Sequence, residues 1–514
     1  MKNQKGLTLT SLIVTVIVMV MIVGIVLLVS VGEEGIIERA NEAKRQAELS
    51  ELKEKIGLEY MGLKNNEANK DKTTSELFIM LDQKMNLDEE HIGDECMIIK
   101  LDQDRVITLL EDGTIIEGRI AILNIANGNI DIKSKGFIQN NGELVEYTGD
   151  YIITGTTTEY CVRIMEEGTY NVTIKNLNID MTGKGKCAFN ANRGLKPTGC
   201  FVTLKIEGEN KLIGGPALGF AKATPNLNGV TNGSTLTIEG NGKLEAIGEA
   251  WTAGIGTGYT GWDSAAGDAV NIIINSGNII AKTETNGCAI GGGLHKGANN
   301  IIINGGNITA KSQNRSAIGA SGDGVMGKII INGGNITADG GEYGGAIGGN
   351  TGSGEVIING GNLNLEHTNV HSGDDAVIGN GTKIVKITGG NIRVYSKNGM
   401  GIGNYRTLPF ELIKEGGSII FEDKICSTPV NMSNETYYLT KIKVGDLGQN
   451  ILITKLETDN DIEYDINNLY TSREGHIFML LPKGEVKVTV IAKNKTYTGT
   501  VYVTPENTEI FTLN

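Results

Sequence analysis

The chain has 514 residues, of which 72 are glycine and only 7 are proline, and aromatic residues make up 5%. This composition is typical of many tight corners and narrow cores, and the abundance of Ile and Val argues against a disordered chain. The formal net charge of −14 gives no electrostatic support for nucleic-acid binding, so we predict no nucleic-acid partner. The 6 cysteines contain no CxxC pair and are predicted to be buried single thiols.

The amino terminus combines a charged tip with a long apolar segment. Lys2 and Lys5 precede 18 almost purely apolar residues, from Leu12 to Val29. That length is close to the minimum for a helix that crosses a bilayer, and the positive-inside rule keeps the tip in the cytoplasm. We therefore predict a membrane anchor, with the residues after about Ser30 outside the cell.

Around the start of this anchor, from Lys5, the chain reads Lys-Gly-Leu-Thr-Leu-Thr-Ser-Leu-Ile-Val. This phrase resembles the class III leader of type IV prepilins and pseudopilins. The resemblance implies that residues 1–6 are a leader, that a prepilin peptidase cuts after Gly6, and that Leu7 is then N-methylated. The family usually has Glu at the fifth mature position, where this chain has Ser11, so a minor subunit or an anchored protein is favoured over a shaft subunit. An uncleaved signal anchor is the alternative.

Two segments follow the leader. Residues 7–63 are predicted to form the membrane helix and a pilin-like stalk, because Ala and Leu recur at helical spacing among charged residues from Ile36 onward. Residues 74–119 are predicted to form a small α/β module, with a capped helix and short strands separated by Asp-rich turns.

A repeated phrase organises residues 120–408. It reads Ile-Ile-Ile-Asn-Gly-Gly-Asn-Ile-Thr-Ala from Ile301, and an apolar residue followed by Gly accompanies each copy. Its marker residues lie 27 to 29 residues apart, at Asn275, Asn304, Asn332, Asn359 and Thr388. Three short β-branched runs per unit, separated by Gly/Asn corners, predict a mainly β fold: a parallel β-helix with three strands per coil and about ten coils. Stacked Asn side chains are expected to hydrogen-bond along the axis.

Two further resemblances concern the later part of the chain. The Ala-Ile-Gly-Gly and Ile-Ile-Asn-Gly-Gly phrases between residues 142 and 403 are similar to bacterial surface β-helices described as carbohydrate-binding-domain proteins. That resemblance implies polysaccharide binding, in some members aided by calcium. Residues 409–514 change to alternating strands, and the phrase from Thr471 resembles transthyretin-like modules, so we predict a C-terminal β-sandwich.

The strongest functional clue is aromatic. The only two tryptophans, Trp251 and Trp262, flank Tyr259 in one glycine-rich stretch. Flat aromatic faces bind the apolar faces of sugar rings, so these three residues are the predicted glycan site. The alternative is that the rings cover the base of their own loop.

Several aspartates are candidates for binding calcium, which needs converging oxygen ligands. They are Asp263, Asp268, Asp374 and Asp375. No EF-hand spacing is present, so turn positions are the alternative interpretation. The sequence requires no cofactor.

Three functions remain open at this point. The first is a surface-anchored, pilin-like protein whose β-helix binds polysaccharide, with prepilin peptidase and other pilin subunits as further partners. The second is a minor pilin or pseudopilin without a ligand. The third is a pectin-active lyase or hydrolase, because His371-Ser-Gly-Asp374-Asp375 resembles the paired-carboxylate motif of polygalacturonases. The other motifs of that family are absent, so we assign no catalytic residue and predict no enzyme activity.

Overall fold

The computed structural model describes backbone from residue 36 and side chains from residue 42 onward. Its gaps are 93–94, 102–104, 192–198, 221–233, 250, 259–269, 285, 299, 323, 325, 350–353, 369–375, 398, 404–408, 423–425, 431, 473 and 507–508. The chain divides into two compact units, residues 1–120 and 121–514. The described residues contain no helix that is both long and apolar enough to cross a membrane. The predicted anchor, Leu12–Val29, and the predicted processing site, Gly6 and Leu7, lie outside those residues.

The first unit is a small α/β structure with its own core. Its described elements are α2 (Ile36–Lys64), α3 (Thr74–Met85) and an antiparallel sheet of β1 (Asp88–Ile92), β2 (Cys96–Lys100), β3 (Val106–Leu110) and β4 (Ile115–Glu117). A capping box starts α3, because Glu76 N donates to Thr73 Oγ1 and Thr73 N donates to the Glu76 carboxylate. The rings of Tyr60 and Phe78 stack with centroids 5.1 Å apart, which joins the end of α2 to α3 in the core.

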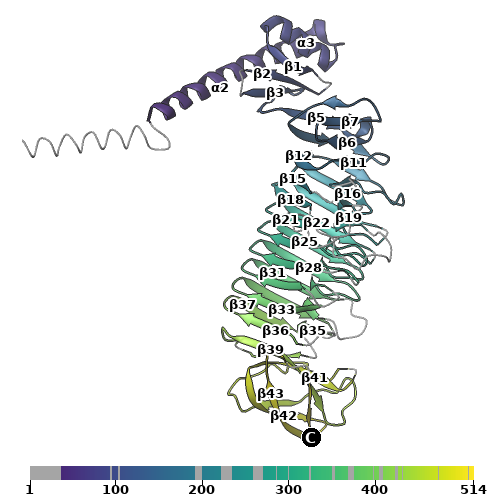
Figure 1. Ribbon diagram of the computed structural model, residues 1–514, viewed down its shortest axis with the longest axis vertical. Coiled ribbons are helices and arrows are strands. Elements are labelled where there is room, and N and C mark those ends of the chain that lie inside the picture. The colour runs from purple at the N-terminus through teal and green to yellow at the C-terminus, as the bar shows by residue number, and fades with distance from the viewer. Residues whose placement is uncertain are drawn as a thin grey trace, which may run out of the picture. The chain divides into compact units, whose positions relative to one another are not determined.

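The second unit is built from parallel strands that stack in three sheets. From β9 to β35, successive strands enter the first, second and third sheet in rotation, and each strand up to β34 pairs with the strand three positions later (Figure 1). We call one circuit of three strands a coil and the whole assembly the coil stack. Nine complete coils are described, with partial coils at both ends. The predicted mainly β fold with stacked parallel strands is confirmed, and the stack is consistent with a parallel β-helix.

The strands of the three sheets have the following bounds. In the first sheet they are β5 (Ile120–Asn124), β9 (Asp150–Thr154), β12 (Gly168–Lys175), β15 (Cys200–Glu207), β18 (Thr235–Gly240), β21 (Asn271–Ile274), β24 (Asn300–Ile303), β27 (Lys328–Ile331), β30 (Gly354–Ile358), β33 (Thr382–Ile387) and β36 (Glu411–Lys414). In the second sheet they are β10 (Thr156–Thr157), β13 (Asn178–Asp180), β16 (Glu209–Gly214), β19 (Lys243–Gly248), β22 (Asn278–Thr283), β25 (Asn307–Ser312), β28 (Asn335–Gly340), β31 (Asn362–His367), β34 (Asn391–Ser396) and β37 (Ser418–Glu422). In the third sheet they are β6 (Ile130–Lys133), β7 (Gly136–Gln139), β8 (Val145–Glu146), β11 (Val162–Ile164), β14 (Phe189–Asn190), β17 (Leu218–Phe220), β20 (Ile255–Thr257), β23 (Ile290–Gly291), β26 (Ile318–Gly319), β29 (Ile347–Gly348), β32 (Ala376–Asn380) and β35 (Met400–Ile402).

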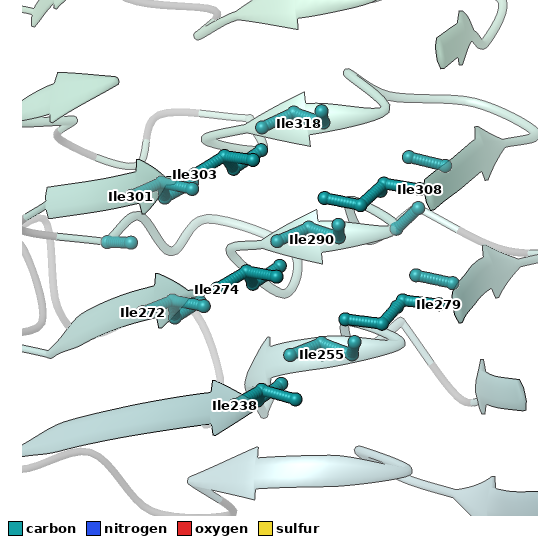
Figure 2. Packing of buried hydrophobic residues seen from close by; sticks show 14 of the residues in the cluster. Ile238, Ile255, Ile272, Ile274, Ile279, Ile290, Ile301, Ile303, Ile308 and Ile318 are labelled. Atoms are coloured by element: carbon teal, nitrogen blue, oxygen red, sulfur yellow. The ribbon is translucent and has the colours of Figure 1, made fainter. Parts of the chain in front are cut away.

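The interior of the coil stack is filled by isoleucines that repeat at the same position in successive coils. In β24, Ile301 and Ile303 are buried, whereas Asn300 and Ile302, which alternate with them, are only half-buried. Isoleucines from all three sheets converge in the interior, and equivalent residues of adjacent coils lie one above another (Figure 2). Burial of each isoleucine side chain stabilises the fold by about 1.5–3 kcal/mol. A shift of one residue would turn these side chains outward, so the alternation within each strand selects the observed strand register.

The apolar-Gly phrase of the repeat has a steric cause in the third sheet. Gly291 has a φ of +129°, and a Cβ on it would lie 1.9 Å from the carbonyl oxygen of Gly319 in the next coil. Gly319 is in the same situation relative to Gly348. Only glycine fits there, because the backbones of neighbouring coils approach too closely for a side chain.

The corners between the first and second sheets carry two ladders of asparagine side chains. On one side of the corner, Asn332 Nδ2 donates to Asn304 Oδ1 at 2.7 Å, and Asn359 Nδ2 donates to Asn332 Oδ1 at 2.8 Å. On the other side, Asn362 Nδ2 donates to Asn335 Oδ1 at 3.0 Å. The predicted hydrogen bonding along the axis is therefore confirmed.

Antiparallel strands close both ends of the coil stack. At its start, β7 and β8 extend the third sheet in antiparallel pairing from β6. At its end, β39 pairs antiparallel with β36 and leads into a terminal module with a second core around Ile442, Ile477 and Val488. The module's strands are β38 (Cys426–Ser427), β39 (Thr436–Val444), β40 (Lys455–Thr458), β41 (His476–Pro482), β42 (Gly484–Ala492), β43 (Lys495–Val503) and β44 (Ile510–Leu513). These pairings occupy hydrogen-bonding edges that would otherwise be free.

The cysteines are distributed through the chain as buried, free thiols. This confirms the prediction of single buried thiols. Burial raises the pKa of the Cys288 thiol to about 12, so it is an inert apolar group at neutral pH.

Candidate functional site

The structure describes one of the three predicted aromatic site residues, Trp251. Tyr259 and Trp262 lie outside the described residues, and so do the four calcium candidates Asp263, Asp268, Asp374 and Asp375. Whether the three rings lie together therefore stays a prediction. In the part of the chain that the structure describes, no group of three or more His, Cys, Asp or Glu side chains could hold a metal ion.

Trp251 lies in the turn between β19 and β20, where hydrogen bonds hold its backbone. Thr252 N donates to Glu249 O at 3.0 Å, and Leu294 N, from the next coil, donates to Trp251 O at 2.8 Å. The side chain remains 46% exposed. A large aromatic surface is thus presented to solvent from an anchored turn, which lowers the entropy that a ligand contact would cost.

The backbone of this turn is strained. Trp251 has a φ of +69°, and His295, which follows the Leu294 contact, has a φ of +60°. Apart from these two and Lys493, every described non-glycine residue with positive φ is Asn or Asp, which tolerate that conformation. Strained bulky residues persist only where their surroundings hold them, and they cluster at ligand sites. The hydrogen bond from Leu294 N to Trp251 O joins the turn of Trp251 to the segment that carries His295 in the adjacent coil.

The segment that carries His295 is tightly packed. Lys296 is 1% exposed, and its carbonyl oxygen accepts a hydrogen bond from Ser321 N at 3.0 Å. Gly293 N donates to the buried Thr257 Oγ1 at 3.0 Å, which ties this segment to β20. No role was predicted for this segment from the sequence. The feature that could have indicated one is the run Gly-Gly-Gly-Leu-His-Lys-Gly from Gly291, which the neighbouring coils do not share.

Two tyrosines of later coils, the half-buried Tyr343 and the exposed Tyr395, differ in their availability to a ligand. The Arg315 guanidinium lies 5.6 Å from the centroid of the Tyr343 ring, which occupies one face of that ring in a cation–π contact. Tyr395 is 37% exposed on the outer face of β34. Among the described aromatic residues, Trp251 is the best candidate for ligand contact, because it has the largest ring and lies on a strained, hydrogen-bonded backbone.

The described residues of the turn that carries Trp251 include one acidic side chain, Glu249. Its carboxylate accepts a hydrogen bond from Gly183 N at 3.0 Å. Asp374 and Asp375 of the polygalacturonase-like motif lie outside the described residues. The described turn thus offers an apolar face with polar backbone around it, which suits a sugar ring.

Comparison of the chain with protein-family models, with curated proteins and with solved structures gave no match.

Proposed function

We propose that this chain is a membrane-anchored bacterial surface protein whose β-helix, of three strands per coil, binds polysaccharide through an aromatic site at Trp251, Tyr259 and Trp262. The observation that carries the proposal is the indole of Trp251, which is 46% exposed on a backbone with a φ of +69°. Exposure of a large apolar ring and retention of backbone strain both cost free energy, and contact with the apolar face of a sugar would offset the first of these costs.

The proposed localisation rests on the first 30 residues. The Lys5-Gly6-Leu7 leader and the apolar segment Leu12–Val29 support export with a membrane anchor at the amino terminus. Ser11, in place of the usual Glu, supports a minor or anchored subunit over a shaft subunit. In this proposal the C-terminal β-sandwich serves as a spacer or cap for the β-helix, which is the binding element.

The leader has its own test. Mass spectrometry of the chain expressed with a prepilin peptidase should show an N-methylated Leu7 at the amino terminus. A chain that still begins at Met1 would support the uncleaved signal anchor instead.

Tryptophan fluorescence tests the aromatic site directly, because the chain has only two tryptophans. Glycans that bind the full-length chain on an array should change its emission on titration. Trp251→Ala combined with Trp262→Ala should weaken array binding and leave the melting temperature almost unchanged. If the double variant bound the same glycans as strongly, the aromatic site would be excluded.

A further inference from the structure

The outer face of the first sheet carries a column of isoleucines that the core does not use. Ile273, Ile302, Ile330 and Ile357 occupy matched positions in β21, β24, β27 and β30. Each is half-buried and alternates with the fully buried isoleucine or valine residues of its strand. The four side chains therefore form a continuous apolar stripe along the outside of the coil stack, which we call the isoleucine column.

Asparagine side chains flank this column. On one side runs the corner ladder, in which Asn304 Nδ2 donates to Asn275 Oδ1 at 2.8 Å and the bonds continue through Asn332 to Asn359. On the other side, Asn300 Nδ2 donates to Asn271 Oδ1 at 2.9 Å. The strands β21 and β24 thus present Asn–Ile–Asn across the face.

The corner ladder leaves hydrogen-bonding capacity at the surface. A carboxamide has two N–H donors and two acceptor lone pairs, and a ladder bond on each side uses one of each. The exposed side chains of Asn304 and Asn332 therefore keep one donor and one acceptor each for water or a ligand. These groups repeat at the strand spacing of about 4.8 Å.

The face has no net charge over these four strands. Its two charged residues, Lys328 and Glu355, form an ion pair at 2.9 Å. A polyanion would find no unpaired cation on this face, and the net charge of −14 on the whole protein would also repel it. The face therefore favours a neutral ligand that offers apolar surface and hydroxyl groups together.

We propose that the isoleucine column and its asparagines bind one extended, neutral polysaccharide chain that lies along the axis of the coil stack. The C–H faces of the sugars contact the isoleucines, and their hydroxyl groups exchange hydrogen bonds with the asparagine ladder. An extended β-linked hexose chain advances per sugar by nearly the strand spacing of about 4.8 Å, so the same contacts repeat along it. This inference rests on the proposed function and names its ligand class, but it uses a different surface, because Trp251 lies between the second and third sheets.

A matched pair of lysine variants tests the face. Ile302→Lys with Ile330→Lys places charge in the column at positions equivalent to Lys386, so lysine is compatible with the strand. Thr309→Lys with Thr337→Lys is the control, because Arg393 occupies the same column on the outer face of the second sheet. Both variants add two positive charges to the outer face of a sheet, and circular dichroism should show nearly the same melting temperature for both.

The measurement is depletion of the full-length chain, in mild detergent, by insoluble cellulose, chitin and xylan, with polygalacturonate as the charged comparison. We expect the wild-type chain and the Thr309/Thr337 variant to be retained equally on a neutral glycan. Retention of the Ile302/Ile330 variant should fall at least about ten-fold, a loss of about 1.4 kcal/mol of binding free energy.

Four results would overturn the inference. Equal retention of the two lysine variants would exclude the face, and loss of retention only in Trp251→Ala would assign all binding to the aromatic site. Preference for polygalacturonate would exclude a neutral ligand. A wild-type dimer that becomes a monomer only in the Ile302/Ile330 variant would show that a second copy covers the column. No retention of the wild-type chain on any glycan would instead overturn the proposed function itself.

Discussion

Single glycines and asparagines decide how closely the coils stack. Gly291 and its equivalents let adjacent backbones approach, and the corner asparagines satisfy one another where the chain turns. The two residue types act differently, because a glycine is needed for steric reasons, whereas an exposed asparagine contributes a replaceable hydrogen bond.

Gly291→Ala should lower the free energy of unfolding by more than about 3 kcal/mol or prevent folding. The new Cβ would lie 1.9 Å from Gly319 O, and the φ of +129° is unfavourable for alanine. Urea unfolding of the full chain measures the change. Gly448→Ala is the control, because no atom lies within 4 Å of its added Cβ and no positive φ is involved, and it should be nearly neutral. Equal stability of the two variants would contradict the steric account.

Asn332→Ala should lower the free energy of unfolding by about 1 kcal/mol. It removes the hydrogen bonds that Asn332 donates to Asn304 and accepts from Asn359, at positions that water also reaches. Asn332→Thr should lower the free energy of unfolding by less than Asn332→Ala does. Thr388 already ends the same ladder and donates to Asn359 Oδ1 at 2.8 Å. Thermal unfolding of both variants measures the difference. If substitution at Asn332 had only a general effect, the alanine and threonine variants would be destabilised equally.

The terminal module contains a buried histidine at the start of strand β41. His476 is 7% exposed, and its Nδ1 lies 3.3 Å from the Glu474 carboxylate. Burial lowers its pKa from 6.5 to about 4, the positive charges of Lys441 and Lys443 act in the same direction, and Glu474 opposes them. The unfolded chain therefore binds a proton near pH 6.5 that the folded module does not bind until about pH 4.

Stability of the terminal module should consequently be full above about pH 6.5 and fall as the pH drops toward 4, by up to about 3 kcal/mol. Chemical unfolding at a series of pH values, followed by the fluorescence of the module's tyrosines, measures the loss. His476→Gln should flatten this part of the pH profile. A profile that is identical in the variant would assign the acid sensitivity to other groups.

The strands and corners could be predicted from the sequence because they depend on local patterns. Alternation in Asn307–Ser312 selects a strand with one buried face, and recurrence of Asn304 after 28 residues at Asn332 places the two at stacked corners. The bond from Leu294 N to Trp251 O has no such signal. It joins two loops whose paths depend on packing in three dimensions, and no local preference would place a tryptophan at positive φ.

In the second unit, the regular repeat supplies one candidate binding surface and a departure from the repeat supplies the other. The regular coils present a neutral face of isoleucine and asparagine, whereas the irregular turn at Trp251 presents an aromatic ring. Sugar rings are the ligand that we propose for both surfaces, and the overall negative charge of the protein does not oppose a neutral glycan. An amino-terminal anchor would hold these surfaces outside the cell.

The most direct test of polysaccharide binding is depletion of the full-length chain from solution by a panel of insoluble polysaccharides. We predict saturable retention on at least one neutral polysaccharide, and release by soluble oligosaccharides of the same sugar. A wild-type chain that stays entirely in the supernatant with every polysaccharide, while it remains folded by circular dichroism, would contradict the account.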